Sequence, residues 1–254
     1  MPAAPHWPPR SAPRLFVTSE LAAGQARTLD GNAAHYLGQV MRVKPGDTVI
    51  LLDNISGEWA ARVEAVGKRH VDMVVIERLR ARETVPDLWL CIAPIKKAHF
   101  DLVIEKATEL GVTRIVPVLM RRCVVDKVNG ARMRTIATEA AEQCARTALP
   151  DIGELIPLPR LLTDWPAGRM LFHADEMGGA AATAAFAAHH GPAALLIGPE
   201  GGFDDVERAM IAAMNGARAI SLGPRILRAE TAAIAASTLW MAQAGDWGGR
   251  LDLT

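Results

Sequence analysis

The sequence predicts an α/β protein in which a small antiparallel β-barrel precedes a larger unit built on a mostly parallel sheet. Between residues 14 and 85, short runs of alternating polar and apolar residues are separated at short intervals by Gly, Pro, Asn and Asp, which is typical of a small barrel. Beyond Pro86, apolar strand-like runs alternate with helical stretches, the pattern of a parallel sheet covered on both faces. With 254 residues, the chain is long enough for both units.

The first unit, expected over residues 14–85, contains four strand-like runs and one short helix. The turn sequences KPGD and NISGE separate consecutive runs, because Pro, Gly, Asn and Asp favour tight turns. The helix is expected within AAHYLGQVMRV, at residues 33–43. The strands are expected at 14–19, 48–53, 58–66 and 70–79.

The second unit, expected over residues 86–254, alternates strands with longer helices. The helix at 98–111 carries an apolar stripe at helical spacing and stops at Gly111, while Asp204 and Glu207 give a later helix a start that resembles a capping box. The strands are expected at 88–93, 114–120, 169–174, 193–198 and 219–223, and the other helices at 131–149, 203–214 and 230–244.

The composition is that of a soluble globular protein, with 50% apolar and 22% charged residues. The first thirteen residues, MPAAPHWPPRSAP, are proline-rich and lack the apolar segment of a signal peptide, so we expect a flexible arm over residues 1–13. No apolar stretch is long enough to span a bilayer. These features favour a cytoplasmic protein that does not associate with membranes.

The cysteines, histidines and charges narrow the partners. Cys91, Cys123 and Cys144 are widely spaced and the histidines are scattered, so we expect buried thiols and no metal. Residues 1–150 carry 21 Lys and Arg against 16 Asp and Glu, and residues 151–254 carry 7 against 12. This excess of positive charge in the first part of the chain favours an anionic partner such as RNA, although a mixed solvated surface explains so small an excess equally well.

Two glycine-proline loops form a candidate ligand site. LLIGPEGG and LGPRIL each follow an apolar strand and precede a helix, so both turns belong at the carboxyl edge of the sheet, where α/β proteins bind ligands. Glycines let the backbone approach a ligand closely, and Ile226 and Leu227 supply apolar walls suited to a flat heterocycle such as adenine. Neither loop matches a phosphate-binding motif, which favours an adenosine without pyrophosphate. The alternative is that these turns only join strands to helices.

Five motifs together resemble one family. The segments EKATELGV, RRCVV, EQCAR, LLIGPEGGF and LGPRILRAETAA, in this order, are similar to the bacterial 16S ribosomal RNA uridine N3-methyltransferases of the RsmE type, within the SPOUT superfamily. The resemblance extends to HYLGQVMRVKPGD in the first unit and leaves out the proline-rich arm. It covers nearly the whole chain.

The resemblance implies a PUA-like first unit that binds RNA, a trefoil-knotted SPOUT methyltransferase domain, S-adenosylmethionine as cofactor and a homodimer that acts on 16S rRNA of the small ribosomal subunit. Knots are rare, and no periodicity in the sequence indicates one. The residues expected to bind the cofactor are Leu196, Ile197, Gly198, Pro199, Glu200, Gly201, Gly202, Leu222, Gly223, Ile226, Leu227, Thr231 and His173.

Methyl transfer to uridine N3 requires loss of a proton from that nitrogen and stabilisation of the uracil anion. Arg228 is the expected donor of hydrogen bonds to the uracil oxygens, and Glu230 the expected proton acceptor or the group that orients Arg228. The competing interpretation is structural, because Glu230 begins a helix whose N-terminus favours a carboxylate, and Arg228 can simply pair with it. His173 and Glu176 are weaker candidates for the chemistry.

For RNA, we expect basic and polar side chains beside the loops and on the barrel to contact phosphates. Solvated surface charge is the alternative for each of them. The expected residues are Arg42, Lys44, Lys96, Arg121, Arg122, Gln143 and Arg146. Two rival functions stay open: a SPOUT methyltransferase for another RNA, and a non-catalytic RNA-binding or assembly factor.

Overall fold

The computed structural model describes residues 7–9 and 11–248, and the chain divides into two compact units. The first comprises the described residues up to Thr84 together with Ala141–Ala148. The second comprises Val85–Ala140 and the described residues from Leu149 onward. No pattern in the sequence indicates that residues 141–148 join the first unit.

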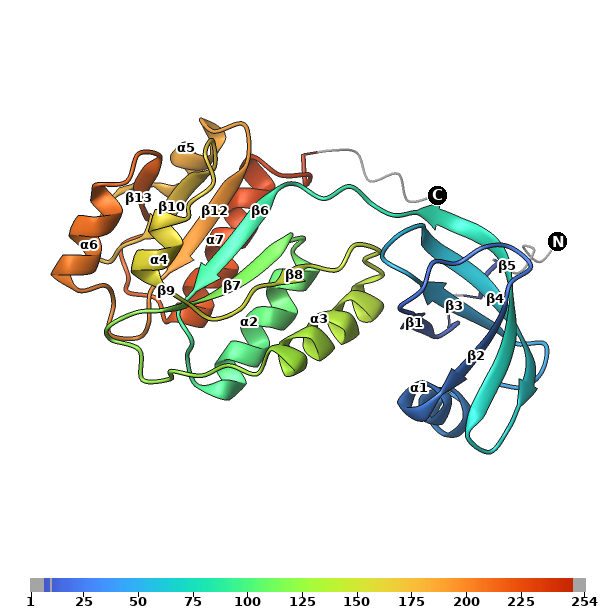
Figure 1. The fold of residues 1–254 in the computed structure, drawn as a ribbon. Coiled ribbons are helices and arrows are strands. Elements are labelled where there is room, and N and C mark those ends of the chain that lie inside the picture. Colours follow the sequence, from blue (N-terminus) through green and yellow to red (C-terminus); the bar gives the residue numbers. More distant parts are fainter. Residues whose placement is uncertain (1–6, 10, 249–254) are drawn as a thin grey trace. The chain divides into compact units, whose positions relative to one another are not determined.

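The first unit is a five-stranded sheet in the order β1-β3-β4-β5-β2 (Figure 1). Strand β1 pairs in parallel with β3, and the other pairs are antiparallel. Strand β2 was not predicted, because ARTLD has few apolar residues and alternates only between exposed and half-buried positions. The elements are β1 (Arg14–Phe16), β2 (Ala26–Asp30), α1 (Gly31–His35), the π-helical turn η1 (Tyr36–Val40), β3 (Thr48–Leu52), β4 (Gly57–Val66) and β5 (His70–Ala81).

The turn after β3 is organised by the buried carboxylate of Asp53. It accepts hydrogen bonds from the backbone N–H groups of Leu21 at 2.8 Å, Ile55 at 2.9 Å and Ser56 at 2.7 Å. The N–H of Gly57 at 3.0 Å and the Ser56 hydroxyl donate to the same carboxylate. Burial raises the pKa of Asp53, but these hydrogen bonds outweigh it and hold the pKa at about 2. A single side chain therefore fixes the connection from β3 to β4.

Residues outside the range predicted for the first unit, 14–85, also belong to it. The Glu142 carboxylate accepts from the N–H of Phe16 at 2.8 Å, and the Glu83 carboxylate accepts from the N–H of Thr147 at 2.6 Å. Ahead of β1, Pro13 is buried and its carbonyl accepts from the N–H of Ile50 at 2.9 Å, so ordered packing begins before residue 14. Of the expected flexible arm, residues 1–6 and 10 lie outside the described part of the chain.

The second unit contains an eight-stranded sheet in the order β11-β13-β10-β12-β6-β7-β8, with β9 paired to β7. Every pair in it is parallel, which confirms the predicted α/β class and places all carboxyl ends at one edge. The short strands β8, β9 and β11 were not predicted. The strands are β6 (Leu88–Ile92), β7 (Arg114–Leu119), β8 (Asp151–Ile152), β9 (Ile156–Pro157), β10 (Met170–Ala174), β11 (Ala180–Ala181), β12 (Ala193–Ile197) and β13 (Ala217–Ser221).

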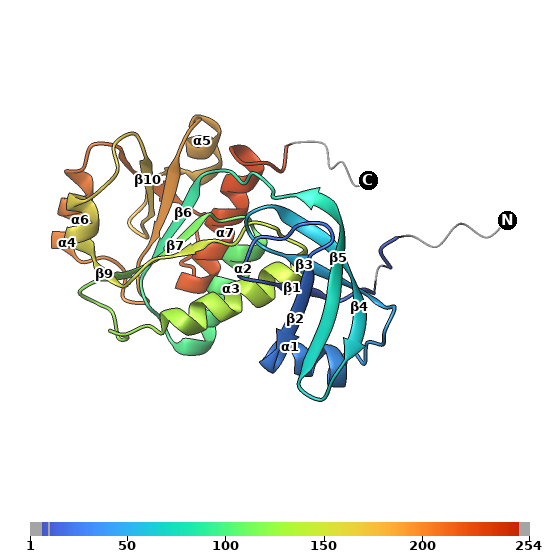
Figure 2. The ribbon, with the colours of Figure 1, turned by 45° about the vertical axis from the view of Figure 1, so that its right-hand side comes forward.

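Helices cover both faces of this sheet (Figures 1 and 2). Alternate residues of the strands face opposite layers, so that Leu90 and Ile92 lie in one core and Cys91 in the other. Four members of the stripe predicted for the helix at 98–111 are buried in the first of these cores, whereas Leu110 is half-buried; the four are Phe100, Val103, Ile104 and Ala107. One face carries α2 (Lys97–Glu109), α3 (Gly130–Cys144), α5 (Ala182–Ala187) and α7 (Ala229–Gln243), and the other carries α4 (Leu158–Thr163) and α6 (Asp205–Ala212).

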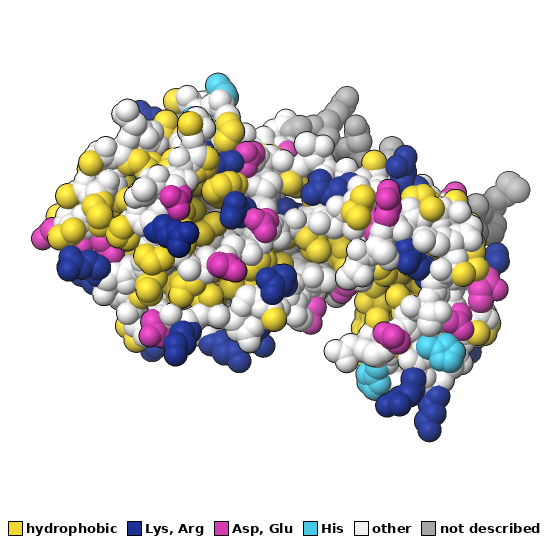
Figure 3. All heavy atoms as spheres, viewed as in Figure 1, with side chains coloured by type: hydrophobic (Ala, Val, Ile, Leu, Met, Phe, Trp, Pro, Cys, Tyr) yellow, Lys and Arg dark blue, Asp and Glu magenta, His cyan; other side chains and the backbone are white. Residues whose placement is uncertain are grey.

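The burial of the three cysteines differs in part from the prediction. None of the three cysteines forms a disulfide. Only Cys91 is buried, and desolvation there raises its pKa to about 12. Cys123 is half-buried and Cys144 is exposed, so the expectation of buried thiols was wrong for Cys144. On the face in view, Figure 3 shows Lys and Arg interspersed with Asp and Glu over the second unit. None of the helices in the described ranges is long and apolar enough to cross a bilayer.

Candidate functional site

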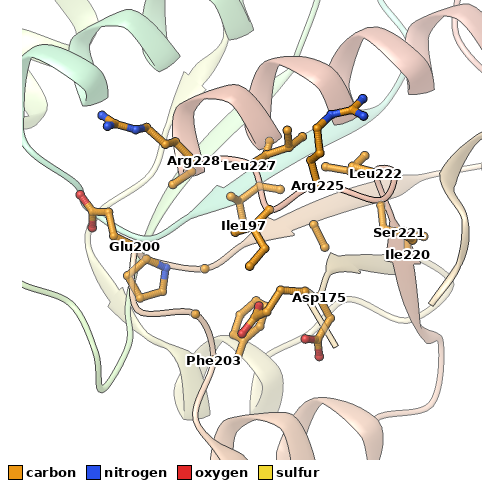
Figure 4. A pocket seen from close by; sticks show the side chains of 18 of the residues that line it. Asp175, Ile197, Glu200, Phe203, Ile220, Ser221, Leu222, Arg225, Leu227 and Arg228 are labelled. Atoms are coloured by element: carbon orange, nitrogen blue, oxygen red, sulfur yellow. The ribbon is translucent and has the colours of Figure 1, made fainter. Parts of the chain in front are cut away.

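A pocket of about 430 Å³ opens at the carboxyl edge of the parallel sheet. It is formed where β10, β12 and β13 end, and the two glycine-proline loops that follow β12 and β13 make most of its wall (Figure 4). Because the three strands are neighbours and parallel, their terminal residues meet at this edge. The lining comprises residues 174–176, 197–203 and 220–229 together with Ala232.

Close packing explains the glycines of the first loop. Gly202 has a φ of +67°, and a Cβ there would lie 2.4 Å from Oε1 of Glu176. A Cβ on Gly201 would lie 3.2 Å from the Cβ of Arg122. The sequence predicted that these glycines let the backbone approach a ligand, whereas the structure shows that protein side chains occupy the space around them.

Arginines from the loop after β7 hold the first pocket loop in place. The Arg122 guanidinium donates to the carbonyl oxygens of Gly201 at 2.8 Å and Phe203 at 3.2 Å. Arg121 forms an ion pair with Asp204 at 3.1 Å, and its backbone N–H donates to Glu207 at 2.7 Å. Both arginines were expected to bind RNA, and here their side chains bind the loop and the start of α6.

The α6 start is a complete capping box, as the sequence predicted. The N–H of Glu207 donates to Oδ1 of Asp204 at 2.7 Å, and the N–H of Asp204 donates to Oε2 of Glu207 at 3.0 Å. Glu207 is buried, and its other oxygen accepts from Arg121. This helix start therefore anchors the end of the first loop.

The second loop supplies an apolar wall. Leu222 and Leu227 are partly buried against the core that contains α7, and Figure 4 shows Leu227 and Ile197 facing each other across the middle of the pocket. Phe203, fully buried, closes the opposite side. Gly223 has a φ of +117°, a conformation that favours glycine, with open space where a Cβ would lie. Ile226 lines the pocket but is 87% exposed.

The carboxylates of Asp175 and Glu176 in the pocket are neutralised by an arginine that lies outside the pocket lining. Asp175 and Glu176 follow β10, and Arg208 of α6 lies 3.1 Å from Oδ2 of Asp175 and 2.6 Å from Oε1 of Glu176. Burial raises the pKa of Asp175, but the hydrogen bond and charge of Arg208 outweigh it and hold the pKa below its usual range. Asp175 was not predicted; its position at a strand end is the signal that also marked the two loops.

Three other charged residues of the pocket are unpaired. No hydrogen bond or ion pair to another described residue engages the side chains of Glu200, Arg225 or Arg228. Figure 4 shows Glu200 and Arg228 extending to the same side of the pocket from the two facing loops, whereas Arg225 extends to the other side. The side chains of Glu200 and Arg228 are thus available to a ligand.

Glu230 lies outside the residues that line the pocket. Its Oε1 lies 3.1 Å from Nδ1 of His99 on α2, and its side chain is 12% exposed. Residues two positions apart on a helix point in different directions, which separates Glu230 from Arg228, the N-cap residue of α7. The predicted Arg228–Glu230 pair is therefore absent between these two described residues, and the partner found, His99, was not predicted.

Most residues expected to bind the cofactor line the pocket, and three do not. Strand alternation turns Leu196 to the opposite core from Ile197. His173 faces Phe203 at 6.2 Å between ring centroids, and desolvation lowers its pKa. Thr231 is exposed on α7. The ten that line the pocket are Ile197, Gly198, Pro199, Glu200, Gly201, Gly202, Leu222, Gly223, Ile226 and Leu227.

The remaining residues expected to bind RNA are dispersed. Lys96 is exposed just before α2, and Arg42 and Lys44 are exposed on the first unit. Gln143 lies on α3, the helix on which it was expected, whereas Arg146 lies beyond the end of that helix at Cys144; both belong to the first unit. Arg146 is also buried, at 4% exposure, and is not available to phosphates. Within the described ranges, no group of three His, Cys, Asp or Glu residues is arranged to hold a metal.

Comparisons with known proteins match both units. A family described as RNA methyltransferase domain matches residues 82–241, and one described as RNA methyltransferase PUA domain matches residues 29–76. The ribosomal RNA small subunit methyltransferase E of Rickettsia conorii is 32% identical over 88% of this chain and 92% of its own. That of Synechocystis is 31% identical over 86% of this chain and 74% of its own.

Solved structures agree with these matches. A Neisseria gonorrhoeae ribosomal RNA small subunit methyltransferase E bound to S-adenosylmethionine superposes with a TM-score of 0.84 at 27% identity, covering 93% of this chain and 99% of that one. A Legionella pneumophila protein in complex with S-adenosylmethionine superposes with a TM-score of 0.82 at 28% identity, covering 92% and 99%. The PUA match and these superpositions confirm the predicted PUA-like first unit and the α/β class, with a mostly parallel sheet, of the second unit.

Proposed function

This chain belongs to the ribosomal RNA small subunit methyltransferase E family, and from that premise we propose that it methylates N3 of a specific uridine in 16S rRNA with S-adenosylmethionine as donor. The observation that carries the proposal is the pocket between the two glycine-proline loops, at the sheet edge where α/β enzymes bind ligands. A relative bearing this name, from Neisseria gonorrhoeae, has been solved with the cofactor bound.

The pocket suits an uncharged adenosine. Its volume of about 430 Å³ falls in the range of small-molecule sites, and Ile197, Leu227 and Phe203 offer apolar surface to a flat heterocycle. The loops at 197–202 and 222–227 would hold the cofactor, leaving backbone groups to fix its polar edges. When bound, S-adenosylmethionine supplies an electrophilic methyl group, and the protein supplies position and electrostatics.

Arg228 is the residue best placed to stabilise the uracil anion. Deprotonation of N3 spreads negative charge onto the flanking uracil oxygens, and a guanidinium offers several N–H donors to such oxygens. Arg228 lines the pocket and makes no ion pair within the described chain, so its donors are free for that role. Removing one such donor lowers turnover by roughly 10²–10³-fold in other enzymes.

The test compares Arg228→Ala with the control Arg218→Ala. Arg218 is an exposed arginine of β13 outside the pocket lining. We expect Arg228→Ala to bind S-adenosylmethionine within about threefold of wild type in calorimetry, while methyl transfer to 16S rRNA falls by roughly 10²–10³-fold. Arg218→Ala should behave as wild type. Full activity of Arg228→Ala would remove this residue from the chemistry, and absence of cofactor binding by the wild type would remove the function itself.

We propose that the protein acts in the cytoplasm as a homodimer, with the small-residue helix α7 packed against its partner, and that its pocket loops form a trefoil knot. Exposed Arg42, Lys44 and Lys96 are proposed phosphate contacts. Light scattering measures the dimer. Mass mapping of methyl groups on ribosomal RNA from a deletion strain identifies the target nucleotide and separates this function from methylation of another RNA or a non-catalytic role.

A further inference from the structure

One carboxylate in the pocket is left free for chemistry. Of the three acidic residues that line it, Asp175 and Glu176 are bound by Arg208, and only Glu200 makes no hydrogen bond or ion pair with another described residue. Glu230, the acid that the sequence favoured, is bound to His99 outside the lining. The free carboxylate of the pocket therefore lies on the first loop and not on α7.

The backbone around Glu200 is held rigidly although its side chain is free. Arg122 binds the carbonyl oxygens of Gly201 and Phe203, and the N–H of Gly202 donates to the carbonyl of Pro199 at 2.9 Å. These contacts fix the loop on both sides of position 200. A backbone held in this way can direct the Glu200 side chain toward a ligand, while its carboxylate oxygens make no hydrogen bonds with the protein and can accept them from the ligand.

The placement of Glu200 and Arg228 matches the imide edge of uracil. That edge presents one N–H donor between two carbonyl acceptors, so its complement is one acceptor beside donors. Glu200 and Arg228 provide this set from the two loops on the same side of the pocket (Figure 4). A phosphate would be repelled by the carboxylate. A neutral imide, in contrast, needs an acceptor such as this carboxylate for its acidic N–H.

Building on the proposed function, we propose that Glu200 is the catalytic base: its carboxylate accepts the N3–H hydrogen bond of the target uridine and takes the proton as the methyl group is transferred. The N3–H bond breaks and its electron pair forms the new bond to the methyl carbon. The carbon–sulfur bond of the donor breaks toward sulfur, leaving a neutral thioether. The proton rests on Glu200 and is released to water after the product leaves.

Neighbouring groups are poorer bases. The Cys123 thiol interacts electrostatically with Glu200, but burial raises its pKa, and the charges of Glu207 and Glu200 raise it further, so it stays neutral. Asp175 is held ionised by Arg208, which weakens its affinity for a proton. Arg122, which follows β7, and Arg228 of the second loop cannot accept a proton.

The test uses the full-length protein and an rRNA substrate carrying either uridine or 5-fluorouridine at the target, because fluorine makes the N3 proton more acidic. The substitution Glu200→Gln keeps the shape of the side chain and removes the carboxylate that would accept the proton. We expect cofactor affinity within about threefold of wild type and a fall in single-turnover rate of roughly 10²–10⁴-fold. 5-Fluorouridine and a higher pH should restore much of that rate, because a uracil ring that has already lost its N3 proton needs no proton acceptor from the protein. Asp205→Asn, an exposed carboxylate at the start of α6, is the matched control and should retain the wild-type rate.

Two outcomes overturn the assignment. One is a Glu200→Gln rate within about threefold of wild type. The other is a loss that neither 5-fluorouridine nor higher pH reduces, which indicates that Glu200 only shapes the loop. If Glu230→Gln shows the rescue and Glu200→Gln does not, the base is Glu230. These results are distinct from failure of the proposed function, in which the wild-type protein itself methylates no uridine.

Discussion

The contact between Gly202 and Glu176 allows a quantitative test of how the first loop is maintained. In Gly202→Ala, the new side chain must adopt a φ of +67°, which costs an L-residue about 1–2 kcal/mol. Its Cβ would lie 2.4 Å from Oε1 of Glu176, so that carboxylate must leave Arg208, at 2.6 Å. The ion pair is partly exposed, and its loss costs roughly 0.5–1 kcal/mol.

The loop can relieve both penalties by leaving this conformation, and binding of S-adenosylmethionine must then restore it. The combined penalty of about 1.5–3 kcal/mol predicts a 10- to 150-fold loss of cofactor affinity in calorimetry. In a Glu176→Ala background the carboxylate is gone, so Gly202→Ala should cost only the conformational part. Gly24→Ala, at a φ of +78° with nothing near its Cβ in the first unit, should lower stability without changing cofactor affinity.

This link between the loop conformation and cofactor affinity is refuted if Gly202→Ala binds the cofactor as tightly as wild type. It is also refuted if the effects of Gly202→Ala and Glu176→Ala are additive, because the two residues would then act independently. A loss of affinity in Gly24→Ala would show that strain in the first unit, and not the shape of the loop, governs binding.

Two further predictions concern the first loop and the first unit. Arg122→Met should weaken cofactor binding by roughly tenfold in calorimetry, because it removes two charge-assisted hydrogen bonds to the loop, whereas Arg121→Met should weaken it less than about threefold; equal effects would contradict the role of Arg122. Asp53→Asn should lower the free energy of opening of residues 55–57, measured by amide hydrogen exchange, by about 2 kcal/mol at pH 7, since the folded-state pKa of Asp53 is lowered from 3.8 to about 2. A lowered carboxyl pKa stabilises the fold above pH 4, and this contribution is lost as the pH falls through 2, so the difference between the two proteins should shrink over that range; a difference that does not change with pH would contradict it.

Regular local patterns in the sequence were sufficient to predict the longer strands of the second unit. The apolar runs became parallel strands, Asp204 and Glu207 became a capping box, and the two glycine-proline loops met at one pocket because parallel neighbouring strands end at the same edge. Short elements escaped prediction. Strand β11, with two residues, and β2, with few apolar residues, carry too little periodicity to be distinguished from loops.

Side-chain partners were the least predictable feature of the site. Arg228 and Glu230 are close in sequence, but the start of α7 points one toward the pocket and the other toward His99, a residue more than a hundred positions away. Likewise, Arg122 looked like a free surface cation until the fold placed Gly201 beside it. Such contacts depend on tertiary packing, which local propensity does not encode.

The discontinuous makeup of the first unit has a consequence for its biosynthesis. Thr147 and Glu142 provide hydrogen-bond partners for Glu83 and Phe16, yet they emerge from the ribosome after the whole barrel sequence. At translation speeds of about 5–20 residues per second, the interval between residues 84 and 148 lasts about 3–13 s. During that interval the nascent first unit has the sequence of all five strands but lacks the hydrogen bonds that residues 142 and 147 supply.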